Sequence, residues 1–594
     1  MRTIVLCSII AMLFLSQNLK AQKSNPEISV DEIRKHIEFL ASDEMKGRKP
    51  GSSEDPIIAA YIRDQFKGYG LTLLADDGYE KVRLVAGIKA GPNNSFSFAE
   101  HKGNLFEDFS PISFTQNASV EGEVVFVGFG YDIKNDKMTW NDYQGVDVTG
   151  KWALILLGEP KSSERTNPFE EYSALRTKVL TAKDHGAVGV IFVYGPQQNK
   201  SDDLIDLQYD KVESTAGIPV IQVKRSLADP LLAKSSTTIE ELENKINTDL
   251  KPNSFKLNLT ASAQTDVSLV WVNSQNIIAV VKSKNKKYRD EYIVVGAHYD
   301  HLGMGGYGSG SRFPDTVAVH NGADDNASGV AGVIELAGKI NGMKKNLKRS
   351  IIFVAFTGEE LGILGSKKFV EDQLVKNSQI KAMINFDMIG RFNEEEKSLL
   401  IGGSGTAEES DSLLNVYSKK HKLILKLSPE GYGPSDHASF YGNNIPVFFI
   451  TTGAHIDYHS WSDDADKINY PGEQKVLNFA LDLLENLATS EKSLTFKEAG
   501  PKSRTGGSSY KVTLGIMPDF AAGDVVGLRV EVVREGGPAF LGGMQNGDII
   551  RAINGLSISN IYDYMNRLKK LEKGELVSVD VIRNGMPVVL IIQL

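Results

Sequence analysis

Short apolar stretches alternate with longer amphipathic ones along the central part of the chain. Stretches that are apolar at nearly every position lie at residues 276–281, 292–298, 350–356, 382–388 and 447–451. Segments with helical periodicity lie at residues 329–340, 361–374, 407–421 and 473–488. Strands that are apolar on both faces and alternate with helices are typical of a mostly parallel sheet with helices on both sides. The pattern therefore predicts an α/β fold for this region.

The segments on either side of this core have a different character. Two stretches with helical periodicity, residues 28–48 and 55–71, precede it. Residues 113–261 hold short apolar strands with glycine stops and one helix, and a polar linker at 491–508 leads to a last module of short strands. At 594 residues the chain is too long for one core. The sequence therefore predicts an α/β domain at 28–112 and 262–490, an inserted β-rich α/β domain at 113–261, and a small domain at 509–594.

The N-terminus has the parts of a secretory signal. Arg2 supplies a positive charge, residues 4–15 are apolar, and Ala21 is a small residue suited to cleavage. The apolar stretch is too short to span a bilayer. Residues 1–21 are therefore predicted to be a signal peptide, and the mature chain to be exported, periplasmic or extracellular, with no membrane span. The only cysteine, Cys7, lies in this segment, so the mature chain has no disulfide, thiolate ligand or cysteine nucleophile.

Composition narrows the class of protein. Hydrophobic residues make up 41% of the chain and charged residues 24%, as in ordinary soluble globular proteins. The net charge of −9 is spread along the sequence, and no basic block offers itself to a phosphate backbone. The sequence therefore does not predict binding to nucleic acid.

Side chains with metal-ligand chemistry follow the predicted strands. They are His298, Asp300, Asp324, Asp325, Glu359, Glu360, Asp387 and His459. Open α/β sheets bind ligands at the carboxyl ends of their strands, so we expect these side chains to share one site. Burying several carboxylates together is costly unless a cation compensates them. Histidine and carboxylate ligands without thiolate suit Zn²⁺, or Co²⁺, Mn²⁺ or Ni²⁺ in its place.

Five segments carry a resemblance to a known family. They are "GAHYDH", "NGADDNASG", "FTGEELG", "NFDMIG" and "YHSWSDDADKI", and the N-terminal "LASDEMKGR" adds to them. Their sequences and their order resemble those of the M28 family of zinc aminopeptidases. The resemblance covers about 28–112 and 262–490, and it implies a phosphorylase/hydrolase-like zinc-aminopeptidase core that holds two Zn²⁺ ions.

The resemblance also implies which residues bind the metals. The five implied ligands are His298, Asp325, Glu360, Asp387 and His459. Asp325 resembles the aspartate that bridges both ions, and we choose it over Asp324 because it lies three residues before Ser328, as in the family. His298 and Asp387 would complete the shell of one zinc, and Glu360 and His459 that of the other. The resemblance further implies a cis peptide bond after Asp325.

Three more residues are implied to take part in catalysis. Glu359 resembles the general base, which takes a proton from water activated by the metals and must stand beside them without binding them. Asp300 lies two residues after His298, hence on the same side of a strand, and could accept the other imidazole N–H. Tyr458 matches a tyrosine that polarises the substrate carbonyl in some relatives, with a packing role as the alternative. For His301, His320 and His455 the expectation is a solvated loop position.

The two accessory domains also carry resemblances. Residues 113–261, with "EGEVVFVGFGYD" and "AKDHGAVGVIFVYG", resemble a protease-associated (PA) domain, which acts as a lid or simply as a spacer. Residues 509–594, with "VTLGIMPDF" and "EGGPAFLGGMQNGDIIRAINGLSI", resemble a PDZ domain. A PDZ domain would add a C-terminal peptide to its sheet edge and hold the terminal carboxylate with loop N–H groups. The alternative is a PDZ domain that binds nothing.

Together these features predict an exported two-zinc aminopeptidase that acts on peptides with free N-termini. One alternative is another metal-dependent enzyme of the same fold, such as a carboxypeptidase or a glutaminyl cyclase. The other is a non-catalytic scaffold in which the PA-like and PDZ-like domains are the working parts. The complete set of implied ligands, together with Glu359, argues against both a one-zinc cyclase and a scaffold.

Overall fold

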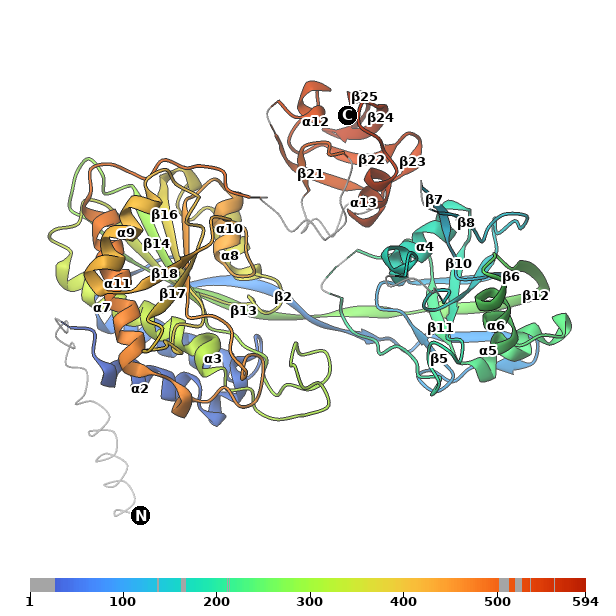
Figure 1. The fold of residues 1–594 in the computed structure, drawn as a ribbon, viewed down its shortest axis with the longest axis horizontal. Coiled ribbons are helices and arrows are strands. Elements are labelled where there is room, and N and C mark those ends of the chain that lie inside the picture. The colour runs from blue at the N-terminus through green and yellow to red at the C-terminus, as the bar shows by residue number, and fades with distance from the viewer. Residues whose placement is uncertain are drawn as a thin grey trace, which may run out of the picture. The chain divides into compact units, whose positions relative to one another are not determined.

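The fold is described from a computed structural model. It describes residues 27–135, 138–161, 167–210, 212, 214–500, 512–518, 526–534, 536–559 and 561–594, so the predicted signal peptide lies outside the described residues. The chain divides into two units, which are described separately (Figure 1). The first comprises residues up to 86 and 271–505, and the second comprises residues 87–270 and 506–594.

A mixed sheet with a parallel centre forms the first unit. Its strand order is β1-β13-β15-β14-β16-β19-β17-β18, and β2 also pairs with β13. The bounds are β1 Thr72–Leu73, β2 Tyr79–Ala90, β13 Val267–Val281, β14 Tyr292–His298, β15 Ser350–Phe356, β16 Ile380–Phe386, β17 Ser398–Gly402, β18 Ile424–Leu427 and β19 Val447–Thr451. The four central strands, β15, β14, β16 and β19, are parallel to one another. The predicted α/β fold with a mostly parallel sheet is therefore confirmed.

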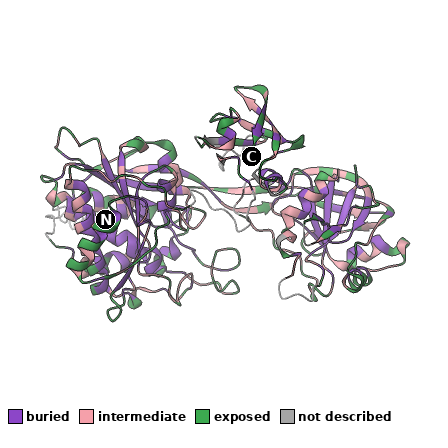
Figure 2. Cartoon of the chain, turned by 45° about the horizontal axis from the view of Figure 1, so that its top comes forward, coloured by how far each residue is buried: buried purple, intermediate pink, exposed green. Residues whose placement is uncertain are grey.

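Helices cover both faces of this sheet. The helices are α2 Val30–Leu40, α3 Asp55–Gly68, α7 Gly329–Met343, α8 Leu364–Asp372, α9 Ser410–His421, α10 His437–Gly442 and α11 Tyr470–Thr489. Ile293 and Val295 of β14 pack in one apolar core with α2, α3, α7 and α11. Val294, between them, packs in the other core with α8 and α10. Figure 2 shows the resulting burial of the strands, which explains why they are apolar at every position.

The second unit contains two further sheets. One has the order β4-β3-β12-β6-β9-β10-β11-β5, and the other has the order β20-β21-β22-β24-β25 with β23 beside β22. The strands of the first are β3 Ser95–Phe98, β4 His101–Lys102, β5 Phe109–Pro111, β6 Ala118–Val127, β9 Trp152–Leu156, β10 Gly189–Val193, β11 Val220–Val223 and β12 Ser254–Thr265. Its helices are α4 Leu175–Asp184, α5 Arg225–Leu232 and α6 Ile239–Asp249, and a hairpin joins β7 Asp132–Lys134 to β8 Thr139–Asn141.

The small sheet of the second unit has a core of its own. Its strands are β20 Ile516–Pro518, β21 Leu528–Val533, β22 Ile549–Ile553, β23 Leu556–Ser557, β24 Leu576–Arg583 and β25 Met586–Gln593. Its helices are α12 Pro538–Leu541 and α13 Ile561–Lys569. Apolar side chains such as Leu514, Ile550 and Val579 form one cluster that includes none of the residues of the larger sheet. This arrangement is that of a small domain with a separate hydrophobic core.

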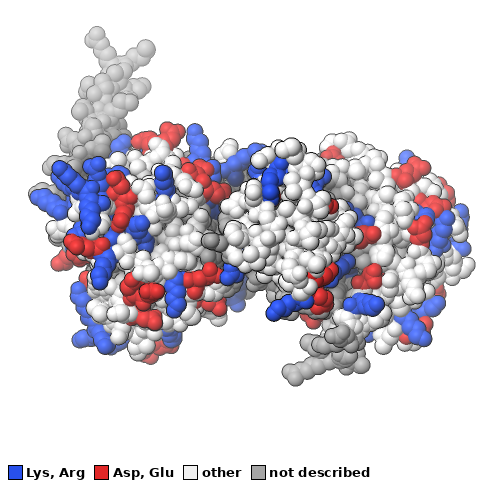
Figure 3. Space-filling view, turned by 90° about the horizontal axis from the view of Figure 1, so that it is seen from above, with Lys and Arg blue, Asp and Glu red and all other residues white. Residues whose placement is uncertain are grey.

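The surface charge and the lengths of the helices complete the description of the fold. Basic and acidic side chains both occur on the face drawn in Figure 3, in keeping with charges of both signs along the sequence. Within the described residues, no helix combines the length and the apolar character needed to cross a bilayer.

Candidate metal centre

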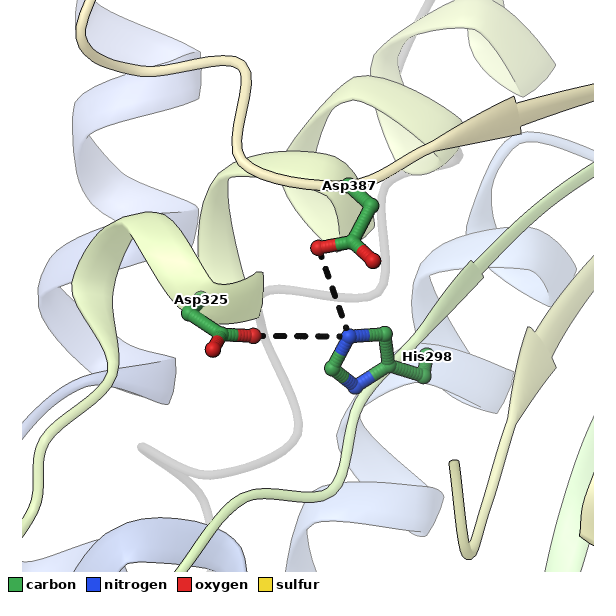
Figure 4. A group of neighbouring side chains, drawn as sticks. All are labelled: His298, Asp325 and Asp387. Atoms are coloured by element: carbon green, nitrogen blue, oxygen red, sulfur yellow. Dashed lines mark ion pairs between the residues drawn. The ribbon is translucent and has the colours of Figure 1, made fainter. Parts of the chain in front are cut away.

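The predicted ligands come together where the parallel strands end. His298 is the last residue of β14, and Asp387 directly follows β16. Asp325 lies in a short helical segment, η4 Ala323–Ser328, immediately before α7. Figure 4 shows the His298 ring facing the carboxylates of Asp325 and Asp387. Residues far apart in sequence therefore meet at the carboxyl edge of the sheet, where open α/β folds bind their ligands.

The first cluster consists of His298, Asp325 and Asp387. Nε2 of His298 lies 3.4 Å from Oδ1 of Asp325 and 3.5 Å from Oδ1 of Asp387. Nδ1 of His298 donates a hydrogen bond to the carbonyl oxygen of Asp300 at 3.1 Å, so Nε2 is left to face the carboxylates. Zn–N and Zn–O bonds of about 2.0–2.1 Å give tetrahedron edges of roughly 3.3–3.4 Å. The three ligand atoms therefore fit a zinc-sized cation.

The second cluster consists of Glu360, His459 and the same Asp325. Nε2 of His459 lies 3.3 Å from Oδ2 of Asp325 and 3.3 Å from Oε2 of Glu360. Nδ1 of His459 donates to the carbonyl oxygen of Gly310 at 3.0 Å, which aims Nε2 at the carboxylates. The two oxygens of Asp325 thus face different clusters, as a carboxylate that bridges two cations would.

A turn brings both Glu359 and Glu360 to this site. The strand β15 ends at Phe356, and Gly358 adopts a left-handed conformation with φ of 68°. The N–H of Glu359 then donates to Oδ1 of Asp300 at 3.1 Å, and the N–H of Glu360 donates to Oδ2 at 3.3 Å. Oε2 of Glu359 lies 4.0 Å from Nε2 of His298. Adjacent residues can therefore both reach the site because the backbone leaves the regular strand.

Asp300 differs in detail from the sequence-based expectation. We expected its carboxylate to accept the imidazole N–H of His298, but its carbonyl oxygen does so, and the carboxylate lies 3.8 Å from Nδ1. The strand has ended at His298, so the carboxylate turns instead to the backbone of the next strand's loop. Asp300 thereby holds Glu359 and Glu360 in place through their N–H groups.

The loop that carries Asp325 is fixed from both sides. The peptide bond between Asp325 and Asn326 is cis, as the family resemblance implied. Oδ2 of the buried Asp463 accepts the N–H groups of Asp324 and Asp325 at 2.9 and 3.0 Å. Asp324 itself accepts from the N–H of Gly390 at 2.6 Å and from His455 at 3.1 Å. The carboxylate of Asp324 therefore braces neighbouring loops, while that of Asp325 faces both clusters.

Arg48 is a structural residue of this site that the sequence reasoning did not single out. Its guanidinium is buried, with 1% of the residue exposed, and burial lowers its pKa to about 10. Within the described residues it donates hydrogen bonds to backbone carbonyl oxygens, namely those of Leu40, Tyr299, Asn321, Gly322 and Asp325. The signal was present in "LASDEMKGR", where a single arginine follows a predicted helix. Arg48 ties the loop after His298 to the loop that carries Asp325.

The electrostatics of the site favour a cation. Burial raises the pKa of Glu359 well above its usual range, and Glu360 and Asp387 raise it further. Burial alone would lower the pKa of His298, but the Glu359 and Asp387 carboxylates raise it well above its ordinary value. Burial alone would also lower the pKa of His459, but Asp325 and Glu360, which accept hydrogen bonds from its imidazole, raise that pKa to about 10. Such shifts mark a strongly negative, desolvated cluster of the kind that divalent cations compensate.

Two of the three histidines that were expected in solvated loops are buried. His301 and His320 are buried, with 1% and 0% exposed, so this prediction is wrong for both. Nδ1 of His301 lies 2.9 Å from Oε1 of Glu360, and His301, Asp325 and Glu360 form a third group with metal-ligand atoms in mutual reach. Side-chain exposure of His455 is 15%. Both buried histidines stand next to acidic motifs, His301 at the end of "GAHYDH" and His320 directly before "NGADDNASG".

Tyr458 stands beside the second cluster. Its ring stacks on the ring of His459, with centroids 3.9 Å apart and an angle of 24° between planes. Burial raises the pKa of its phenol, and Asp325 raises it further, so the hydroxyl stays protonated. A protonated phenol can donate a hydrogen bond to a developing oxyanion.

The α/β sheet carries two histidine–carboxylate clusters at its carboxyl edge, an arrangement that suits metal-dependent chemistry, and comparison with known proteins identifies the domains. Residues 276–484 match the model of Peptidase family M28, residues 113–231 that of the PA domain, and residues 501–594 that of the PDZ domain. The chain thus carries a peptidase domain of family M28 together with a PA and a PDZ domain. The sequence-based assignment to an M28-like metallopeptidase with these accessory domains is confirmed.

Several known proteins are similar to parts of this chain. "Aminopeptidase YwaD" of Bacillus subtilis is 28% identical over 50% of this chain and 52% of its own length. A "Probable zinc metalloprotease" of Pyrenophora tritici-repentis is 30% identical over 34% of this chain and 46% of its own. The chain thus spans about half the length of the curated relatives it matches. An aminopeptidase from Aneurinibacillus aligns structurally with a TM-score of 0.47 at 22% identity, over 80% of this chain and 97% of that one.

Proposed function

We propose that this protein is a two-zinc aminopeptidase that removes residues from the N-termini of peptides. The observation that carries the proposal is the position of Asp325 between two clusters, with its Oδ1 near His298 and its Oδ2 near His459. His298, Asp325 and Asp387 would hold one ion, and Glu360, His459 and Asp325 the other. Zn²⁺ bound there would supply a Lewis acid that polarises the carbonyl and activates water.

Glu359 would act as the general base in this proposal. Its carboxylate lies beside His298 without being closer than 4.0 Å to Nε2, and its side chain keeps 11% exposure. Burial raises the pKa of Glu359, and a raised pKa suits a group that must take a proton from water and hand it to the leaving amine. Tyr458 would donate its O–H to the carbonyl oxygen as charge builds up there.

The same carboxylates would select the end of the chain that is cut. Of the acidic residues near His459, Asp463 is engaged by the N–H groups of Asp324 and Asp325 and by Arg391, so it offers nothing to a substrate. Glu359 and Asp387 remain as partly exposed carboxylates of the site, with 11% and 14% side-chain exposure. A protonated α-amine paired with either would form a strong charge-assisted contact.

Free-amine peptides should therefore be shortened one residue at a time from the N-terminus, and N-acetylated copies should be nearly inert. Acetylation removes the positive charge that Glu359 or Asp387 would pair with, and it adds bulk beside buried side chains. Mass spectra of a digest of matched free and acetylated peptides will show the products. Internal fragments, residues released from the C-terminus, or equal cleavage of the acetylated peptide would contradict the aminopeptidase assignment and favour a carboxypeptidase or an endopeptidase.

The purified chain should bind two divalent ions per molecule. The alternatives are a one-ion cyclase and a scaffold without metal. Neither would need a carboxylate such as that of Asp325 between two clusters. Elemental analysis after zinc loading and gel filtration gives the stoichiometry directly. One tightly bound ion, or none, would contradict the two-zinc proposal, even if the protein cleaves peptides.

The accessory parts complete the proposal. We infer that the chain is exported through its N-terminal signal. The domain bounds predicted from the sequence are peptidase 28–112 and 262–490, PA-like 113–261 and PDZ-like 509–594. Residues 95–111 form β3, β4 and β5 of the larger sheet of the second unit, so we propose that this stretch belongs with the PA-like domain. The PDZ-like domain would take a C-terminal peptide as its ligand. Sequencing the N-terminus of the secreted protein would test cleavage after Ala21.

A further inference from the structure

His301 is buried beside the metal centre, although it is not one of the five proposed metal ligands. It is 1% exposed, and its backbone N–H donates to the carbonyl oxygen of Arg48 at 3.2 Å. A Cβ added to Gly322 would come within 2.5 Å of its ring, so the loop toward Asp325 approaches it as closely as glycine allows. The backbone of His301 is therefore fixed to that of Arg48, and its ring packs closely against the loop at Gly322.

The two nitrogens of this imidazole have different surroundings. Nδ1 lies 2.9 Å from Oε1 of Glu360, a hydrogen-bond distance, and 3.9 Å from Oδ2 of Asp325. Nε2 is buried and has no hydrogen-bond partner among the described residues. A proton on Nδ1 satisfies the Glu360 contact and leaves only a lone pair unpaired, whereas a proton on Nε2 would bury an unsatisfied N–H. The geometry thus places the proton on Nδ1.

We propose that His301 is a positioning residue that fixes Glu360 as a single-oxygen metal ligand. Oε1 of Glu360 accepts from Nδ1 of His301, and Oε2 is the oxygen 3.3 Å from Nε2 of His459. The two oxygens of one carboxylate therefore have separate tasks, one held by His301 and the other turned to the second cluster. This inference rests on the proposed function, because it assigns a role toward an ion in the Glu360–His459 cluster.

His301 could instead be a metal ligand itself, since its atoms lie within mutual reach of Asp325 and Glu360. The separations between the ligand atoms favour the positioning role. His459 stands 3.3 Å from both carboxylates, the separation of neighbouring ligands around zinc, whereas Nδ1 of His301 is 2.9 Å from one and 3.9 Å from the other.

The test compares two amide substitutions of His301 in the full chain. The amide nitrogen of His301→Asn falls close to the position of Nδ1, and that of His301→Gln close to the position of Nε2. Loss of a group that orients a ligand typically lowers metal affinity 10–100-fold. We therefore expect His301→Asn to keep both zinc affinities and His301→Gln to weaken one binding step by about 10–100-fold, leaving the other step unchanged.

Zinc titration of the metal-stripped protein against a competing chelator measures both steps. His36→Gln is the matched control, because His36 is a buried histidine that contacts a buried glutamate, Glu335, at 3.3 Å, and it lies on α2. The proposal would be overturned if both His301 variants kept wild-type zinc affinity or if both lost it. It would also be overturned if His301→Gln weakened both binding steps. A wild-type chain that shows only one step would instead contradict the two-zinc function, so the two failures are distinguishable.

Discussion

Glu359→Gln is expected to lower kcat by about 10²–10⁴-fold while the protein keeps both metal ions, the loss expected when a general base is removed. The amide has the shape of the carboxylate but cannot take a proton from water. The backbone around it should not change, because Asp300 holds this turn through the N–H of residue 359 rather than through its side chain. Turnover of a chromogenic aminoacyl substrate and elemental analysis of the same sample give the two quantities.

Glu360→Gln is the control for this experiment. Its Oε2 faces Nε2 of His459 at 3.3 Å, so neutralising it should weaken metal binding before any effect on the chemical step is visible. Excess zinc should then restore part of the activity of Glu360→Gln but none of the activity of Glu359→Gln. If Glu359→Gln lost metal while Glu360→Gln kept it, the roles of the two neighbours would be reversed.

The sequence could predict the location of this site because the chemistry lies at strand ends. His298 ends β14 and Asp387 follows β16, and both apolar strands were evident from their continuous hydrophobicity. The short strand β18 could not be recognised in the same way, because it is largely exposed and its side chains do not alternate between a buried and an exposed face. Pairing partners, such as the antiparallel contact of β17 with β19, also depend on tertiary structure.

The sequence could not predict how the side chains of the site divide their hydrogen bonds. Asp300 was expected to use its carboxylate on His298, yet the carboxylate holds two N–H groups of the glutamate turn. His301 was expected in solvent, yet it lies against Glu360. Both outcomes depend on where the loop bends after its strand. Beyond that bend, successive side chains no longer alternate between the two faces of the sheet, so the strand pattern cannot place them.

Arg48→Met is expected to destabilise the first unit by about 3–5 kcal/mol and to weaken metal binding, since removing one partner of a buried charge arrangement leaves the others uncompensated. The five carbonyl oxygens that Arg48 contacts would lose their donor. A buried acceptor left unpaired costs about 1–3 kcal/mol, and the loops concerned carry His298 and Asp325. Asp325, Asp463 and Asp300 would also lose the attraction of the Arg48 charge.

Urea unfolding of metal-free wild type and variant measures this loss without a contribution from the ions. Arg63→Met on α3 is the matched control, because Arg63 pairs with the exposed Asp64 and Asp77, and surface pairs contribute about 0–1 kcal/mol. Arg48→Lys should recover little, since one ammonium cannot reproduce a planar fork that reaches carbonyls in several directions. A shift for Arg48→Met no larger than that for Arg63→Met would show that the loops around Asp325 hold their shape without the buried guanidinium, and that the metal centre is organised by its carboxylates alone.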